Sequence, residues 1–336
     1  MVEHLVSLEG AEVGFPCGAG DRVRRAALRA GLGLAYECNS GSCGSCRYQL
    51  VSGEVRNRRP GAPGLTARDR RRGRRLACQD EPVSACTVRA ATTGGPVGHR
   101  PGRHRAELQV VHQLTHDMAE FVFLTDHPAR FRPGQYAMLE LPGVTGERAY
   151  SMCNLANPCG EWRFVIKRVP GGAATEVLFD KLNPGDRIAL DGPFGHAFLR
   201  EDDHRIVCVA GGSGLGAMLG VVSGLAALPR PLSRSAHVFY GGRTGRDLCR
   251  LPVLDRVADR LGELRFTPVV SEPDAPVPPG LRTGYVHDAV AAELGNDLGG
   301  RTFYAAGPPV MTEALARLLV LDSGVPADRL HYDRFL

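Results

Sequence analysis

The chain has 336 residues, of which 43% are hydrophobic and 23% are charged, a composition that excludes wholesale disorder. The net charge of +5 is uneven, because residues 1–90 hold 15 Arg against 9 Asp and Glu, whereas the remainder holds 26 Lys and Arg against 27 Asp and Glu. The first residues, MVEHLVSLEGAEVG, are not a basic start followed by an apolar run, so we expect no signal peptide and a cytoplasmic protein.

The first 90 residues have the pattern of a small α+β unit. VEHLVSL (2–8) and RYQLVSGEV (47–55) read as strands, and RVRRAALRAGL (22–32) has helical spacing. We expect a domain over residues 1–92. The stretch ATTGGPVGHRPGRHR (91–105) is rich in Gly, Pro and basic residues, which is typical of an interdomain linker.

Four cysteines of this unit have a distinctive spacing, Cys38-x4-Cys43-x2-Cys46 and then Cys78 thirty-two residues later. This is the plant-type [2Fe–2S] spacing. The intervening NSGSCGS is small and glycine-rich, which lets backbone amides approach the sulfurs, and thiolates suit a thiophilic iron cluster. A zinc site would show paired knuckles, and a thioredoxin-like pair would need neither Cys38 nor Cys78. We therefore expect an iron–sulfur loop, with no helix in the basic stretch before Cys78.

The remaining cysteines fit no metal pattern, and a reducing compartment is indicated for a chain with ten cysteines and no export signal. Cys208 lies in an apolar strand pattern and is expected in the core. His112 and His116 have metal-like spacing, but they lie in a strand and turn, so we expect no metal there. No role is assigned to Cys17, Cys86, Cys153, Cys159 and Cys249.

After the linker, five short apolar segments are divided by Pro and Gly turns. Strands at this spacing predict a closed or nearly closed antiparallel barrel. The segments are ELQVVHQL (107–114), EFVFLTD (120–126), QYAMLELP (135–142), WRFVIKRV (162–169) and DRIALDGP (186–193).

Two motifs of this block favour a flavin nucleotide. Arg148, Tyr150 and Ser151 stand at a strand end, where arginine can neutralise a pyrophosphate and tyrosine offers a flat surface for a ring. Gly171 and Gly172 lead a helical segment that contains Thr175, and glycine-led amides at a helix start can cradle the same anion. Each feature is common alone, and together they indicate a flavin in the barrel.

From about residue 204, apolar strands alternate with helical segments, which predicts a parallel, doubly wound sheet. In IVCVAGGSGLG an apolar strand runs into Gly211, Gly212 and Gly214 before a helix, the context of a diphosphate-binding turn. The next strand, AHVFYGGR, ends at Arg243 with no acid, so we expect a nucleotide binder of a lineage other than the dehydrogenases. No charge occurs over 206–228, but its glycines argue against a membrane helix.

Taken together, these motifs resemble the reductase components of bacterial multicomponent oxygenases, in which a plant-type ferredoxin is fused to a ferredoxin–NADP reductase-like module. The resemblance spans almost the whole chain and is nearest to the reductases of toluene, alkene and isoprene monooxygenases. It implies a multidomain fold: a β-grasp [2Fe–2S] domain (1–92), an antiparallel β-barrel FAD domain (103–200) and an α/β nicotinamide-nucleotide domain (201–336). The matching segments are YECNSGSCGSC, LACQ, FRPGQY, RAYS, DGPFG, AGGSGLG, FYGGR, TGYVH, AGPPVM and HYDRFL.

The resemblance also implies roles for single residues. Ser151 would lie near the reactive flavin nitrogen and Phe335 near the isoalloxazine. One departure is Ala306, because many relatives have cysteine there to help place the nicotinamide. The cluster ligands would be Cys38, Cys43, Cys46 and Cys78; the FAD contacts Arg148, Tyr150, Ser151, Lys167, Gly171, Gly172 and Thr175; and the nicotinamide contacts Gly211, Gly212, Gly214, Arg243, Gly307 and Pro308.

The implied function is electron transfer from NADH through FAD and the [2Fe–2S] cluster to a Rieske ferredoxin or the hydroxylase of a diiron hydrocarbon monooxygenase. Two alternatives stay open: a reductase for a Rieske dioxygenase or a sugar-deoxygenating enzyme, and a redox-sensing regulator that binds nucleic acid. We expect a monomer that binds neither nucleic acid nor a membrane. NADH is favoured over NADPH, because Asp247 would repel a 2′-phosphate that Arg243 and Arg246 would accept.

The run ARDRRRGRR (67–75) has six arginines. A solvated face is the plain interpretation of such a run. A docking patch for an acidic electron acceptor is the next, since charged patches steer encounter. Nucleic-acid binding is the weakest, because no aromatic residue is interleaved.

Overall fold

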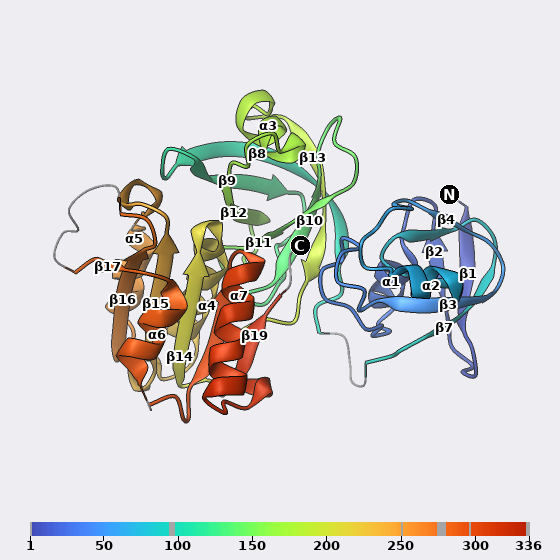
Figure 1. Ribbon diagram of the computed structural model, residues 1–336. Coiled ribbons are helices and arrows are strands. Elements are labelled where there is room, and N and C mark those ends of the chain that lie inside the picture. Colours follow the sequence, from blue (N-terminus) through green and yellow to red (C-terminus); the bar gives the residue numbers. More distant parts are fainter. Residues whose placement is uncertain (1, 94–97, 250, 274–279, 296, 334–336) are drawn as a thin grey trace.

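The computed structural model describes residues 2–93, 98–249, 251–273, 280–295 and 297–333. The chain forms three units, with the central one between the N-terminal and C-terminal ones (Figure 1). Among the described residues, no helix is long and apolar enough to cross a membrane.

The N-terminal unit is the predicted β-grasp fold. Its main sheet has the order β2-β1-β7-β3-β5, in which β1 and β7 are parallel, and β4 pairs with β6. Helix α1 lies beside the sheet and buries Val23, Ala26 and Ala27 in the core. The elements are β1 (Glu3–Leu8), β2 (Gly14–Gly18), α1 (Val23–Arg29), β3 (Arg47–Ser52), β4 (Val55–Asn57), α2 (Ala67–Arg71), β5 (Arg74–Leu76), β6 (Asp80–Pro82) and β7 (Cys86–Ala90).

The expectation of no helix before Cys78 is wrong, because α2 occupies part of the basic stretch. Thr66 accepts a hydrogen bond from the Asp69 amide at 3.1 Å, and the Asp69 carboxylate accepts from the Thr66 amide at 3.2 Å. This reciprocal capping box satisfies two amides at the start of the helix. Three of the six arginines of the basic run, Arg68, Arg70 and Arg71, lie on this short helix.

The central unit is a six-stranded antiparallel sheet of order β11-β10-β13-β8-β9-β12. Its two edges nearly close the barrel, because Met152 bridges Phe164 and the Cys153 amide donates to the Arg163 carbonyl at 2.9 Å. Strand β8 begins at Gly102, so the predicted linker ends before residue 105. The elements are β8 (Gly102–Gln113), β9 (Met118–Thr125), β10 (Tyr136–Glu140), β11 (Arg148–Ser151), β12 (Glu161–Lys167), α3 (Ala173–Glu176), η1 (Val177–Lys181) and β13 (Arg187–Phe194).

The C-terminal unit is the predicted parallel sheet, with the order β17-β16-β15-β14-β18-β19 and helices packed on it. Its strands are β14 (Arg205–Gly211), β15 (Ser235–Gly242), β16 (Glu263–Val270), β17 (Arg282–Thr283), β18 (Thr302–Ala306) and β19 (Leu330–Tyr332). Its longer helices are α4 (Leu215–Ala227), α5 (Pro252–Ala258), α6 (Val286–Leu294) and α7 (Pro309–Ala316), the last continued by η5 (Arg317–Asp322). Single turns are η2 (Gly212–Gly214), η3 (Pro231–Ser233), η4 (Gly245–Asp247) and η6 (Ala327–Arg329).

Helix α4 packs against the barrel through glycines. A Cβ on Gly216 would come within 2.9 Å of Val165, one on Gly220 within 2.8 Å of the Met152 carbonyl, and one on Gly224 within 2.5 Å of Pro133. Residues four apart lie on one helix face. The glycines that argued against a membrane span therefore serve a close contact between two units.

The contact between the N-terminal unit and the barrel is charged. Arg25 on α1 is 1% exposed and binds Glu147 at 2.7 Å and Asp191 at 3.0 Å. Arg29 binds the same Asp191 at 2.7 Å, and Arg22 lies 3.8 Å from Glu147. One face of α1 is thus fixed to the barrel by ion pairs.

Candidate functional site

The four predicted cluster cysteines come together at the edge of the N-terminal unit that faces the barrel. Cys38 and Cys78 are fully buried, Cys46 is buried and Cys43 is half-buried. Their thiols form two close pairs: Cys43 is hydrogen-bonded to Cys38, and the Cys46 thiol donates to Cys78 at 3.3 Å. A cluster with two irons and four thiolates requires two sulfurs at each iron, so the arrangement in pairs fits it.

Hydrogen-bond donors favour the thiolate form of Cys38 and Cys78, whereas the hydrogen bond that each of Cys43 and Cys46 makes, together with burial, raises the pKa of these two thiols. The amides of Ser42 and Cys43 both donate to the Cys38 sulfur at 3.3 Å, and the Gln79 side-chain amide donates to Cys78 at 3.4 Å. The hydrogen bond from Cys43 lowers the pKa of Cys38, and the bond from Cys46 lowers the pKa of Cys78 against the effect of burial. Hydrogen bonds to the sulfurs are one of the factors that set the potential of an iron–sulfur cluster.

Glycines make the cysteine loop compact. Gly41 and Gly44 have φ of +87° and +78°, a region that side chains rarely adopt. A Cβ on Gly44 would lie 2.5 Å from the Gly64 carbonyl, and one on Gly64 would lie 2.7 Å from the Gly41 carbonyl. The residues therefore fit a cluster held in a tightly wrapped loop.

A cleft of about 960 Å³ separates the barrel from the carboxyl ends of β14 and β18. Its volume suits a nucleotide-sized ligand. Arg148 and the Gly171–Gly172 pair are not among the described residues that line it, and Phe335 lies outside the described residues. The predicted site residues that do line it are Tyr150, Ser151, Lys167, Thr175, Gly211, Gly212, Gly214, Arg243, Gly307 and Pro308.

The glycines of the cleft have different physical roles. A Cβ on Gly214 would lie 2.0 Å from the Ala306 carbonyl, and those on Gly211 and Gly307 would lie 2.8 Å and 2.6 Å from Met311. These three glycines let β14, β18 and α7 approach one another. Gly212, with φ of +54°, would meet only the Lys167 side chain at 3.5 Å, so its missing side chain leaves room in the cleft.

Two of the predicted FAD contacts are held by local bonds. The Thr175 hydroxyl accepts from the Val169 amide at 3.1 Å and donates to the Gly172 carbonyl at 2.9 Å, so it fixes the turn before α3. Arg148 is exposed at the start of β11, and its guanidinium donates to the carbonyls of Thr145 and Glu147 at 3.3 and 3.2 Å. Tyr150 and Ser151, by contrast, line the cleft.

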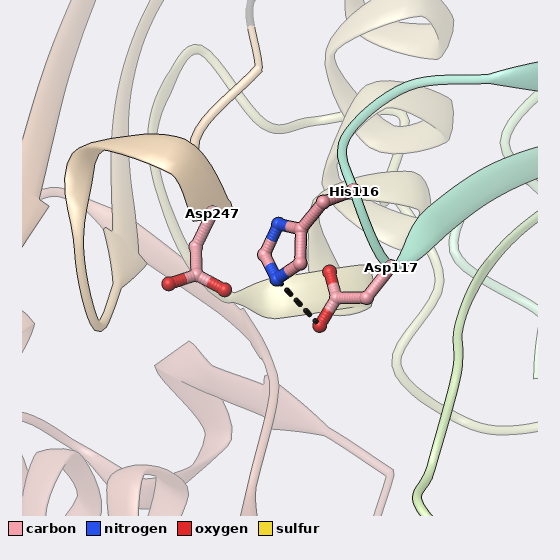
Figure 2. Close-up of side chains that lie close together, drawn as sticks. All are labelled: His116, Asp117 and Asp247. Atoms are coloured by element: carbon pink, nitrogen blue, oxygen red, sulfur yellow. Dashed lines mark ion pairs between the residues drawn. The ribbon is translucent and has the colours of Figure 1, made fainter.

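A charged cluster at the cleft was not anticipated from the sequence. His116 and Asp117, from the turn between β8 and β9, lie opposite Asp247 of η4 (Figure 2). The Lys167 ammonium binds Asp247 at 2.8 Å and Asp117 at 3.2 Å, so one cation of the chain is shared between two carboxylates.

The ion pairs perturb the groups that form them. Burial opposes ionisation of Asp247, but hydrogen bonds from Lys167, the Thr244 amide and the Thr244 hydroxyl lower its pKa to about 2. Burial likewise acts against the charged form of Lys167, and the two carboxylates raise its pKa. Asp247 therefore remains an anion in the cleft. From the sequence we expect this carboxylate to disfavour the 2′-phosphate of NADPH.

Three domain families match in chain order. The 2Fe-2S iron-sulfur cluster binding domain matches residues 6–82, the oxidoreductase FAD-binding domain residues 105–198, and the oxidoreductase NAD-binding domain residues 208–317. Together they account for all three units of the fold. FAD, a [2Fe–2S] cluster and a nicotinamide nucleotide are thereby supported as cofactors.

Relatives match over nearly the full length. Ferredoxin–NAD(P)(+) reductase CarAd of Metapseudomonas resinovorans is 40% identical and is covered to 99%, as is this chain. The ferredoxin–NAD(+) reductase component of the alkene monooxygenase system of Xanthobacter autotrophicus is 39% identical, with 96% of this chain and 98% of the relative covered. A solved structure, "Ferredoxin reductase in carbazole 1,9a-dioxygenase", matches with a TM-score of 0.89 and 34% identity over 100% of this chain and 99% of that one. The chain belongs to the ferredoxin–NAD(P)+ reductases of oxygenase systems.

Proposed function

We propose that this reductase passes electrons from NADH, through FAD and the [2Fe–2S] cluster, to a Rieske ferredoxin or the hydroxylase of a diiron hydrocarbon monooxygenase. The observation that carries the proposal is the position of the two thiol pairs. They lie where the N-terminal unit meets the barrel, with Tyr36, two residues before Cys38, accepting a hydrogen bond from the Gly195 amide of the barrel at 3.1 Å. A route for electrons between the two units is therefore short.

The cofactors divide the chemistry. A bound FAD would supply the chemistry that joins a two-electron donor to a one-electron acceptor. Cys38, Cys43, Cys46 and Cys78 would hold the cluster. Ser151 and Tyr150 would orient the flavin ring at the cleft, and Arg148 and the Gly171–Thr175 turn would hold its phosphates.

The nucleotide enters from the other side of the cleft. The missing side chain of Gly212 leaves space beside Lys167, and Gly307 and Pro308 follow the end of β18. Arg243 lies at the cleft with Asp247 close along the chain. The carboxylate of Asp247 disfavours the additional phosphate of NADPH, so NADH is the preferred donor.

The electron acceptor docks on an arginine-rich face beside the cluster loop. Arg59 donates to the Ser40 carbonyl of that loop at 2.8 Å, and Arg70 donates to the Pro60 carbonyl at 2.6 Å. Arg68, Arg71 and Arg72 are exposed and make no ion pair among the described residues. Such a face attracts an acidic partner and loses its attraction as salt rises.

The direction of transfer supports this acceptor. Plant-type clusters lie near roughly −400 mV and Rieske centres between about −150 and +300 mV, so passage from the first to the second is downhill. A reductase of a Rieske dioxygenase is the second candidate, and it is favoured by the structural match to the carbazole dioxygenase reductase. Rates measured with purified acceptors of each class separate the two.

Replacing Cys46 by Ser tests the order of the centres. The variant should keep NADH-dependent reduction of a dye through FAD and lose reduction of the ferredoxin by at least about 100-fold, because the cluster lacks one thiolate. Cys159→Ser is the matched control, since that thiol is exposed and lies outside the four. Ferredoxin reduction at the normal rate in Cys46→Ser would contradict the proposed route.

A further inference from the structure

Arg24 is a buried cation that forms no ion pair with an acidic side chain among the described residues. Its side chain is 0% exposed, and neither terminal guanidinium nitrogen has a hydrogen bond within the described part of the chain. Its one side-chain bond runs from Nε to the Asn39 amide oxygen at 3.2 Å. The neighbouring Arg25 is equally buried but binds two carboxylates. An uncompensated buried charge costs several kcal/mol, so Arg24 requires an explanation that Arg25 does not.

Three contacts place Arg24 against the segments that carry the proposed cluster ligands. Its backbone amide donates to the carbonyl of Ala77, the residue before Cys78, at 3.0 Å. Asn39, which accepts from Nε, directly follows Cys38. Tyr36, two residues before Cys38, places its ring centroid 3.9 Å from the guanidinium carbon.

The same guanidinium also faces the barrel. Its carbon lies 5.0 Å from the ring centroid of Phe194, at the end of β13. Two barrel carboxylates at this interface have other partners, since Glu147 binds Arg25 and Asp191 binds Arg25 and Arg29.

We propose that Arg24 is a positioning residue that sets the reduction potential of the [2Fe–2S] cluster. A cluster held by four thiolates is anionic, and each added electron increases its negative charge. A guanidinium in a low-dielectric site stabilises the more negative state, so it raises the potential. The step is the arrival of one electron from the flavin side with no proton taken up, because arginine stays protonated throughout.

This proposal rests on the four cysteines being the cluster ligands, and it explains why the charge is tolerated without a carboxylate. The cluster itself supplies the compensating negative charge. The location between Phe194 and the ligand loop also places the charge on the side from which the electron comes. A cation there favours transfer toward the cluster and opposes its return.

The test is a redox titration of the purified full-length protein, followed by the EPR signal of the cluster, in Arg24→Met and Arg24→Lys. Methionine removes the charge at similar volume, and the one-electron equilibrium should shift at least tenfold toward the oxidised cluster, which is a fall of about 59 mV. Lysine retains the charge and should restore most of the potential. An unchanged potential in Arg24→Met overturns the proposal.

Arg47→Met is the matched control. Arg47 follows Cys46 directly, but its side chain is 41% exposed and lies 3.4 Å from Asp69, so its charge is screened and paired. Its removal should move the potential by much less than the tenfold shift. A fall as large as that of Arg24→Met would show a general effect of net charge and would contradict a specific role of Arg24.

A second variant tests the proposal if Arg24→Met fails to assemble a cluster. Asn39→Asp is isosteric and places a carboxylate on Arg24 Nε, which compensates the charge without emptying the site. The potential should again fall at least tenfold in the equilibrium constant, and an unchanged value contradicts the proposal. Absence of a cluster in the unaltered protein would instead remove the proposed function itself, so the two failures are distinct.

Discussion

The barrel contacts its two neighbours by opposite means. Toward the N-terminal unit it presents Glu147 and Asp191 to arginines of α1, one of which is 1% exposed. Toward the C-terminal unit it meets the bare glycine face of α4, where backbones approach too closely for a side chain. Ion pairs dominate the contact with α1, whereas close backbone packing dominates the contact with α4.

The difference separates two tasks. Buried ion pairs fix an orientation while adding little net stability, because desolvation offsets the attraction. The glycine contact holds the barrel and the sheet at close range and leaves the cleft of about 960 Å³ open for a nucleotide beside it. The charged contact should therefore govern the one-electron output, and the glycine contact the hydride step.

Arg25→Met breaks the charged contact and has the largest expected effect. It leaves Glu147 and Asp191 with weaker partners in a buried site, which costs about 3 kcal/mol of docking between the two units. Reduction of ferredoxin should fall at least tenfold while dye reduction by NADH persists. Thermal unfolding and the two activities, assayed on the same preparation, measure this.

Arg89→Met is the control for that experiment. Arg89 pairs with Glu9 on the surface of the same unit and is 63% exposed. Its loss should leave stability and both activities nearly unchanged. Equal losses of stability and activity in Arg89→Met and Arg25→Met would show that the buried ion pair between the units contributes no more than a surface ion pair.

Gly220→Leu breaks the glycine contact. Its Cβ would lie 2.8 Å from the Met152 carbonyl, so the helix must move away from the barrel at a cost of about 2 kcal/mol. Because hydride transfer spans this contact, dye and ferredoxin reduction should fall together. Gly299→Leu, where an added Cβ meets nothing within 4 Å, is the control. A selective loss of ferredoxin reduction in Gly220→Leu would reverse the assignment of the two contacts.

Asp333 makes the stability of the contact between units depend on pH. It lies at the end of the C-terminal unit and contacts the barrel at His196, next to the charged contact. Burial raises its pKa to about 6, and the His196 amide, which donates at 3.0 Å, only partly offsets this. A carboxyl with a raised folded-state pKa costs no stability below its unfolded pKa, and the cost grows as pH rises and is complete above pH 6.

Asp333→Asn should consequently be more stable than the unaltered protein at pH 7.5, by on the order of 2 kcal/mol, and lose this advantage near pH 4. Asparagine keeps the acceptor for the His196 amide, so the change isolates the charge. Melting temperatures across that range measure the difference. Parallel profiles for the two proteins would mean that Asp333 is not buried in the folded state.

Asp247→Asn tests the cleft between the barrel and the C-terminal unit, and it has the smallest expected effect. Removing the carboxylate that Lys167 binds should raise kcat/KM for NADPH about tenfold, which is about 1.4 kcal/mol, and change that for NADH less. Asp288→Asn, with a side chain 67% exposed on α6, is the control. No gain with NADPH would assign nucleotide preference to another group.

Local pattern predicted the parts of this molecule that depend on neighbours in sequence. The cysteine spacing predicted four cluster ligands, and the structure brings their thiols together in two pairs. Strand and helix periodicity predicted a small α+β unit, an antiparallel barrel and a parallel sheet, and all three are present. Helix α2 was not predicted, although the sequence contains its capping box, Thr66 with Asp69 three residues later. The predicted linker extended too far, into the start of strand β8. The first residues of this strand are a glycine and polar side chains, which are also typical of linkers.

Contacts between distant segments were beyond sequence reasoning. Arg24 and Arg25 have the same residue type on the same helix, and only the barrel, more than a hundred residues away, decides that one is paired and the other is not. Lys167 and Asp247 are separated by 80 positions, so their ion pair had no local signal. Thr175 was predicted from a glycine motif to contact FAD, but its hydroxyl forms hydrogen bonds within its own turn.

The most direct test of the electron route is the absorbance and EPR spectrum of the freshly purified protein before and after addition of NADH. We expect a flavin and an iron–sulfur chromophore at the start, no EPR signal from the oxidised cluster, and a reduced-cluster signal once NADH is added. Protein that contains neither iron with acid-labile sulfide nor flavin, or a cluster that stays EPR-silent after NADH bleaches the flavin, would contradict it.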